Sequence, residues 1–364
     1  MTRLSTVLSV LATLAFWAAA PGASQSRLIP HAATALQDGL IVTAEGFIHP
    51  GYDTLAAETD RLRDALTAYC AGGSTFGPVR GGFEGSFLAW QRISVIQIGP
   101  IMEAEGPMRF QLWPDPKGFS RRAIRAAVGR ADPALLEPGA LEGHSIALVN
   151  LTALEALLFP APPKPGTYAC DLGRAIASFQ ADLAADLAAT WAPGTGFRAA
   201  YDTALSGNAT YPNVDALLRE LLAGFVVYTD RLRKFKIERG LGAAKGDARP
   251  ERLEANRSGL GLASMQAGFE TLAEAYTQSG GLFARTSDAG GSMDHFLLAD
   301  TARSLATTLA LMPGSLEEIA EEDGLLAAEL RRFGQFVAIH EDYLKTGLPR
   351  SIGLTSGFTS ADGD

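Results

Sequence analysis

Cysteine is scarce in this chain of 364 residues, which contains only Cys70 and Cys170. Two cysteines are too few for a metal site built on cysteine ligands, and without a Cys-x-x-Cys-His motif the chain cannot attach haem covalently. In an oxidising compartment we expect the pair to form a disulfide, with two buried free thiols as the alternative. Such a bond would close a loop of about 100 residues and, in the chain-entropy model, stabilise the fold by roughly 4 to 5 kcal/mol.

Basic residues are outnumbered by acidic ones. The chain has 31 Lys and Arg residues against 40 Asp and Glu residues, which gives a formal net charge of -9 and an isoelectric point near 5.2. Because there is no basic stripe to meet phosphates, nucleic acid is excluded as a partner. The densest basic segment, Arg231 to Lys236, ends a predicted helix, and we expect it to be a solvated face that complements the helix dipole.

Common catalytic signatures are missing as well. None of the five histidines is followed three residues later by a carboxylate, and no His-Glu-x-x-His motif occurs. There is no Gly-x-Ser-x-Gly sequence, and the glycine-rich runs lack the lysine of a phosphate-binding loop. These absences argue against serine hydrolase and nucleotide-binding chemistry, and they leave no complete zinc motif.

Only one long apolar run is present, from Leu4 to Ala20, preceded by Arg3 and followed by small residues. This pattern is typical of a secretory signal, and it predicts a signal peptide over residues 1–23 with cleavage after Ala20 or Ala23. An uncleaved membrane anchor is the alternative interpretation of the same run. We therefore expect an exported protein.

Alternating strand patterns are absent, and apolar residues recur at helical spacing, so the sequence predicts an all-α fold. A Ser315-x-x-Glu318 capping box marks the start of the last predicted helix. Loops are expected at 105–118, 240–250 and 280–291, where glycine and proline cluster. The predicted helices cover residues 51–70, 83–98, 171–191, 214–235, 253–276, 293–311 and 315–345, with a further short helix around residue 155.

That short helix carries the most informative residue. Glu155 falls within an apolar helical stripe formed by Leu151, Leu154 and Leu158. Burying an unpaired carboxylate is costly, so Glu155 must meet a cation or metal, hold a proton, or lie at the edge of a wet cleft. A structural ion pair inside the helical core is the alternative to a functional site.

The same segment resembles the Gly-x-His-x-x-Glu motif of imelysin-like proteins, which is followed by a Leu-Leu-aromatic run. Glu155 and the run 157–159 match, but Asn150 replaces the glycine and Thr152 replaces the histidine. Further stretches that resemble the family are AWQRISVIQIGP (Ala89 to Pro100), LWPDPKGFS (Leu112 to Ser120) and GLTSGFTSADGD (Gly353 to Asp364).

The resemblance implies two four-helix-bundle-like halves, residues 24–191 and 192–364, with the motif near the cleft between them. It also implies a periplasmic or outer-membrane-associated protein of bacterial iron uptake, with a membrane or haem protein as partner. Iron or another divalent metal is the implied ligand, with Glu155 as a metal ligand. The founding member of the family was described as an insulin-cleaving metalloprotease.

Thr152, in place of the motif's histidine, weakens the ability of the motif to bind a metal. A neutral hydroxyl is a poor zinc ligand, so we predict no catalytic residue and interpret the chain as a binding or delivery protein without peptidase activity. A metal-dependent peptidase that uses Glu155 and a nonstandard second ligand is the alternative, and a structural partner for a membrane or haem protein is the third hypothesis. The predicted binding cleft comprises Asn150, Thr152, Glu155, Arg109, Trp113, Asp115 and His340.

Overall fold

The structure is a computed structural model that describes residues 28, 30–159, 161–194, 196–290 and 293–354. Within these ranges every regular element is a helix, which confirms the all-α prediction. The predicted signal peptide and the stretch 355–364 lie outside the described residues. None of the described helices combines the length and apolar character needed to cross a membrane.

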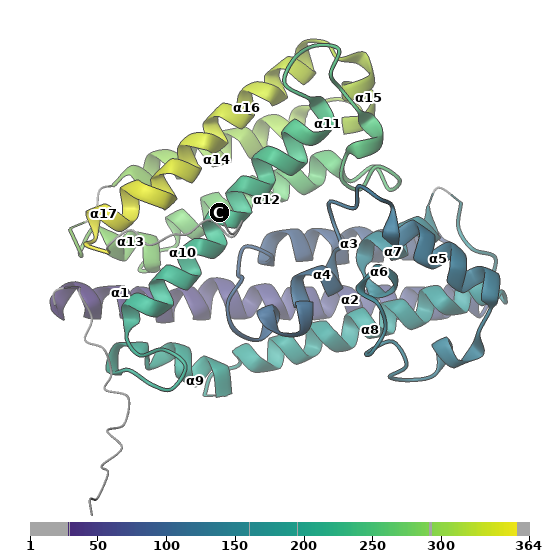
Figure 1. The fold of residues 1–364 in the computed structure, drawn as a ribbon, viewed down its shortest axis with the longest axis horizontal. Helices are drawn as coiled ribbons and strands as arrows, with labels where there is room; N and C mark the ends of the chain where they lie inside the picture. The colour runs from purple at the N-terminus through teal and green to yellow at the C-terminus, as the bar shows by residue number, and fades with distance from the viewer. Residues whose placement is uncertain (1–27, 29, 160, 195, 291–292, 355–364) are drawn as a thin grey trace, which may run out of the picture.

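The first layer is built on one long helical rod (Figure 1). It consists of α1 (Pro30–Thr43), the π-helical turn η1 (Ala44–Ile48) and α2 (His49–Cys70). Pro50 lies at the start of α2 and has no N–H for the preceding turn, which accounts for the local π-helical winding. The helix α2 packs against α3 (Gly77–Ile93) and α8 (Tyr168–Trp191).

A disulfide joins the end of α2 to the start of α8. Cys70 and Cys170 are bonded, and their Cα atoms lie 5.6 Å apart, so the predicted pairing is confirmed. The neighbouring Tyr69 hydroxyl donates a hydrogen bond to the Pro163 carbonyl at 2.9 Å. The segment that leads into α8 is therefore fixed to the end of α2.

The second layer contains α10 (Val214–Asp230), α12 (Gly261–Thr277), α14 (Asp294–Leu311) and α16 (Leu325–Asp342). The helix α12 packs against α14 and also against α3 of the first layer. The rod of α10 continues through the π-helical η5 (Arg231–Glu238) into α11 (Arg239–Leu241). This continuation places the end of the rod above α3 and α7 (Figure 1).

Shorter elements complete the fold. The α-helices among them are α4 (Gly106–Phe110), α5 (Phe119–Arg130), α6 (Ile146–Val149), α7 (Leu151–Leu158), α9 (Gly196–Asp202), α13 (Leu282–Thr286), α15 (Leu316–Glu322) and α17 (Leu348–Ser351). The 3-10 turns are η2 (Gly99–Glu105), η3 (Pro133–Leu136), η4 (Ala204–Ser206) and η6 (Pro250–Arg252), and the π-helical turn η7 (Tyr343–Gly347) joins α16 to α17.

One connected apolar core runs through both layers, from Leu28 to Leu354. The division of the chain into halves at residues 191 and 192 remains a prediction.

Several predicted boundaries were wrong. The helix predicted over 83–98 is α3, which starts six residues earlier and ends at Ile93. It continues through Gly82 because a Cβ there would lie only 2.9 Å from the Cα of Leu62, so tertiary packing requires this poor helix former. The predicted loops 105–118 and 280–291 contain α4 and α13, and α5 was not predicted at all.

The last predicted helix is interrupted. The capping box is confirmed, since the Glu318 N–H donates to the Ser315 hydroxyl and the Ser315 N–H donates to the Glu318 carboxylate. However, α15 ends at Glu322 because Asp323 adopts a left-handed backbone conformation with φ of 45°. The Asp323 carboxylate accepts hydrogen bonds from Gly246 and Arg331, so contacts distant in sequence hold this break in place.

Candidate functional site

The helix α7 carries Glu155 and begins at Asn150. The Asn150 side-chain oxygen accepts a hydrogen bond from the Ala153 N–H at 3.0 Å, and its nitrogen donates to the Ser120 hydroxyl at 3.3 Å. Asn150 is fully buried, so the structure gives this predicted cleft residue the role of a helix cap. The cap fixes the start of α7 against α5 and thereby sets the position of Glu155.

The Glu155 carboxylate is almost completely surrounded by hydrogen-bond donors. One oxygen accepts from the backbone N–H groups of Arg257 at 3.1 Å and Ser258 at 3.0 Å, and from the Ser258 hydroxyl at 2.8 Å. The other oxygen lies 3.4 Å from Nη1 of Arg257. Because the carboxylate is only 4% exposed, these donors replace the water that it loses on folding.

The segment that binds Glu155 was predicted to be the start of a helix. That helix, predicted over 253–276, begins at Gly261 instead. Ala255 has a positive φ of 53°, and the residues up to Leu260 form turns. A helical conformation would have used the N–H groups of Arg257 and Ser258 within the helix, whereas the observed turn directs both at Glu155.

A buried polar network lies next to this segment. Glu254 forms an ion pair with Lys236, and Gln111 donates to the Glu254 carboxylate at 2.7 Å. Lys236 also donates to the Gln91 side chain at 2.7 Å. Lys236 was predicted to lie on a solvated face, but it is only 5% exposed, because the basic segment runs under the loop that carries Glu254.

Charge interactions determine the ionisation of Glu254. Burial disfavours its charged form, but the ammonium of Lys236 and the hydrogen bonds from Lys236, Ser264 and Gln111 outweigh this effect and hold the pKa of Glu254 below its usual value. The network therefore contains a charged pair that joins α3, η5 and α12 through buried side chains. Removing one partner would leave an uncompensated charge in an apolar environment.

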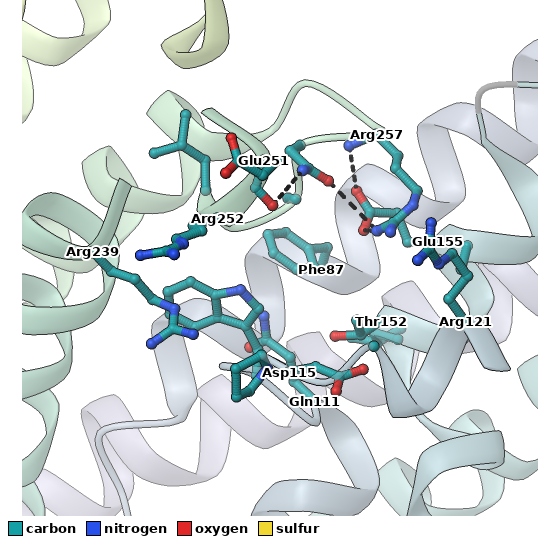
Figure 2. Close-up of a pocket in the computed structure, with 18 residues that line it drawn as sticks. Phe87, Gln111, Asp115, Arg121, Thr152, Glu155, Arg239, Glu251, Arg252 and Arg257 are labelled. Carbon is teal, nitrogen blue, oxygen red and sulfur yellow. Dashed lines mark hydrogen bonds and ion pairs between the residues drawn. The ribbon is translucent and has the colours of Figure 1, made fainter. Parts of the chain in front are cut away.

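A cavity of about 440 Å³ opens beside Glu155 (Figure 2). Phe87, Trp113 and Thr152 line it together with Glu155, and the loop 251–257 closes the opposite wall. The charged groups that line it are Asp115, Arg121, Glu155, Arg239, Glu251, Arg252 and Arg257. The structure thus brings Trp113, Asp115, Thr152 and Glu155 together, as four of the seven predicted cleft residues.

Two of these residues have clear structural roles. Asp115 accepts hydrogen bonds from the N–H groups of Phe119 at 2.7 Å and Ser120 at 2.8 Å, which caps the start of α5. The Trp113 ring packs edge-to-face on Phe235, with centroids 6.2 Å apart. These contacts hold the segment that carries Trp113 and Asp115 at the cavity wall.

Arg109 and His340 lie elsewhere. Arg109 lines a second cavity, along α8, where its guanidinium carbon lies 5.9 Å from the centroid of the Phe179 ring. His340 is buried between α16 and α14, with Nδ1 2.9 Å from the Phe336 carbonyl oxygen and Nε2 3.0 Å from the Leu298 carbonyl oxygen. Burial lowers the pKa of His340, which is consistent with a hydrogen-bonded core residue.

The residues around Glu155 do not fit a metal centre. Thr152 supplies only a hydroxyl, and the Glu155 oxygens are occupied by Arg257 and Ser258. Burial raises the pKa of Glu317 in α15, and the negative charge of Glu155 adds to this effect. Because a carboxylate must lose its proton to bind a metal, Glu317 is a poorer metal ligand than an ordinary glutamate. Among the described residues no group of three or more His, Cys, Asp or Glu side chains is placed to hold a metal ion.

The sequence-based prediction missed the arginines of the cavity. Arg121, Arg239, Arg252 and Arg257 come from α5, α11, η6 and the loop that follows η6. No spacing rule links residues so far apart in the chain, and only the folded arrangement brings them together. The cluster of Arg249, Arg252 and Arg257 within a short segment was the sole local signal.

Comparison with known proteins agrees with this fold. The family model described as Imelysin matches residues 48–332. An imelysin-like protein from Psychrobacter arcticum 273-4 superposes with a TM-score of 0.72 at 20% identity, covering 90% of this chain and 98% of that one. A putative iron-regulated protein A precursor from Parabacteroides distasonis ATCC 8503 gives a TM-score of 0.71 at 12% identity, covering 87% and 95%. No curated protein matches the sequence.

Proposed function

The chain belongs to the imelysin family, and we propose that it is an exported binding or delivery protein of iron supply that lacks peptidase activity. One observation carries the proposal: the only acidic residue retained from the family motif, Glu155, is held by Arg257 and Ser258. A carboxylate in this position is unavailable as a general base or a metal ligand without breaking the turn that binds it.

Export and the link to iron have separate support. The Cys70–Cys170 disulfide fits an oxidising compartment, and the apolar N-terminal run fits a signal peptide, so a periplasmic or outer-membrane-associated location is proposed. The structural neighbour from Parabacteroides distasonis is described as iron-regulated and as a precursor. In this proposal iron is the cargo of the protein, and the partner is a membrane or haem protein that receives or supplies it.

A direct assay tests for peptidase activity. Purified protein is incubated with casein and insulin, with and without added Zn²⁺, and fragments are followed by mass spectrometry. We expect no cleavage above that of a Glu155→Gln preparation. Cleavage that both a chelator and Glu155→Gln abolish would instead support the metal-dependent peptidase.

The link to iron is tested in cells. The abundance of the protein is measured by quantitative mass spectrometry in iron-starved and iron-replete cultures of the source organism. We expect an increase on starvation, and unchanged abundance would contradict a role in iron supply.

A further inference from the structure

Three arginine side chains at the cavity have no anionic partner in the part of the chain that the structure describes. Among the described residues, the guanidinium groups of Arg121, Arg239 and Arg252 form no ion pair and no side-chain hydrogen bond, although each lines the cavity beside Glu155. The chain as a whole carries a net charge of -9, so this local excess of positive charge runs against its overall composition. Like charges that share one cavity repel each other, and a bound anion relieves that repulsion.

The carboxylates of the cavity offset this charge only in part, because four arginines and three carboxylates line it. Asp115 is occupied by the first N–H groups of α5, and Glu155 is occupied by Arg257 and Ser258. Glu251 is the remaining acidic side chain of the lining, and it forms no ion pair within the described part of the chain. Three arginines therefore face one uncommitted carboxylate.

The arginines stand at two ends of the cavity (Figure 2). Arg239 and Arg252 approach from one side, and Arg121 lies on the other side near Glu155, with Phe87 between them. A guanidinium group binds carboxylate oxygens through paired N–H donors, and its geometry suits this better than a lysine. A ligand with anionic groups at both ends satisfies both sides, whereas a single small oxyanion reaches only one.

We propose that this cavity binds a small organic polycarboxylate, alone or as its ferric chelate, with Arg239 and Arg252 at one end of the ligand and Arg121 at the other. The volume of about 440 Å³ suits a small molecule, and Phe87 and Trp113 provide apolar walls for its carbon skeleton. The ferric form rests on the proposed role in iron supply, while binding of the metal-free anion does not. In the chelate the carboxylates carry the iron, so the protein needs no metal ligands of its own.

Isothermal titration calorimetry tests the proposal with citrate, ferric citrate and inorganic phosphate as probes. We expect one citrate or ferric citrate per chain, and a loss of affinity of about tenfold or more in Arg239→Gln, Arg252→Gln and Arg121→Gln, since each removes a charge-assisted contact. Arg332→Gln is the matched control, because Arg332 is an exposed arginine of α16, away from the cavity, that pairs with Glu329 of the same helix. Thermal unfolding of every variant establishes that it is folded.

Each outcome decides a separate point. If neither citrate form binds, if phosphate binds as tightly as citrate, or if the three cavity variants bind like Arg332→Gln, the proposal is wrong. If metal-free citrate binds with the expected arginine dependence but ferric citrate does not, the polycarboxylate site stands and its ferric form is wrong. If the protein is induced by iron starvation and yet binds no polycarboxylate, only the site assignment fails.

Discussion

The carboxylate of Glu155 accepts a hydrogen bond at 3.0 Å from the backbone N–H of Ser258, which lies 103 residues further along the chain. This contact joins α7 to the loop that closes the cavity, and the Arg257 guanidinium supports it on the other carboxylate oxygen. Glu155 thus performs for the loop what an N-cap performs for a helix, because it accepts hydrogen bonds from backbone N–H groups that have no other partner within the described ranges.

Replacing Glu155 by Ala should lower the free energy of unfolding by about 2 to 3 kcal/mol, because two backbone N–H groups and the Ser258 hydroxyl lose a charged acceptor. Urea denaturation followed by circular dichroism measures the change. Thr152→Ala, on the same helix, is the control, and we expect it to cost less than about 1 kcal/mol. A Glu155→Ala protein as stable as the wild type would show that the carboxylate is not a structural anchor.

Lys236→Met should lower the free energy of unfolding by about 3 to 5 kcal/mol at pH 7, since it leaves Glu254 buried without its cation. The folded-state pKa of Glu254 is depressed, so its contribution is present above the unfolded pKa of about 4.3 and is lost as pH falls through the lower folded value. In Lys236→Met the cation is gone and burial raises the pKa of Glu254, so the variant takes up a proton as the pH is lowered while Glu254 of the wild type stays charged. The difference between Lys236→Met and the wild type should therefore shrink as the pH is lowered from 7 towards 4.

Lys234→Met provides the comparison for this variant. Lys234 lies two residues earlier, is exposed and pairs with Asp230, so its loss should cost less than about 1 kcal/mol at any pH. Equal costs for the two substitutions, or a pH-independent cost for Lys236→Met, would contradict the buried charged pair.

Removing the disulfide should destabilise the protein strongly. The bond closes a loop with a sequence separation of 100 residues, and in the chain-entropy model its loss costs about 4 to 5 kcal/mol. The double variant Cys70→Ala with Cys170→Ala, compared with the oxidised wild type in urea denaturation, measures this cost. A loss below about 1 kcal/mol would contradict the chain-entropy account of this bond.

Thr152→His restores the missing histidine of the family motif. The substitution places an imidazole one helical turn before Glu155, and imidazole is a better transition-metal ligand than a hydroxyl. Because both Glu155 oxygens are occupied by Arg257 and Ser258, we expect Zn²⁺ affinity to rise by less than about tenfold. A much larger gain in calorimetry would show that the carboxylate exchanges these partners for a metal readily.

The sequence predicted those features that depend on local pattern. Helical periodicity located α2, α8, α10 and α14, and the oxidising compartment predicted the Cys70–Cys170 bond. The position of Glu155 on an apolar stripe indicated that a buried carboxylate there needs a partner. A structural ion pair was one of the interpretations that the sequence left open. These inferences use residues that are close in sequence or few in number.

The sequence failed where long-range contacts decide the conformation. The turn before α12 has an amphipathic helical pattern. It is not helical, because the Glu155 carboxylate accepts hydrogen bonds from the N–H groups of Arg257 and Ser258. Lys236 belongs to a basic segment that is typical of a solvated face, but its ammonium is buried against Glu254. In both cases the deciding partner lies on another element, so no window of sequence contains the signal.

Calorimetric titration of the wild type and Glu155→Gln with Zn²⁺ and Fe²⁺ tests the central claim most directly. If Glu155 anchors the loop 257–258, the two proteins should give the same weak, non-stoichiometric heats, because no metal depends on that carboxylate. Tight binding of one metal ion per wild-type chain that Glu155→Gln abolishes, in a variant that remains folded, would show that Glu155 is a metal ligand and would contradict the account.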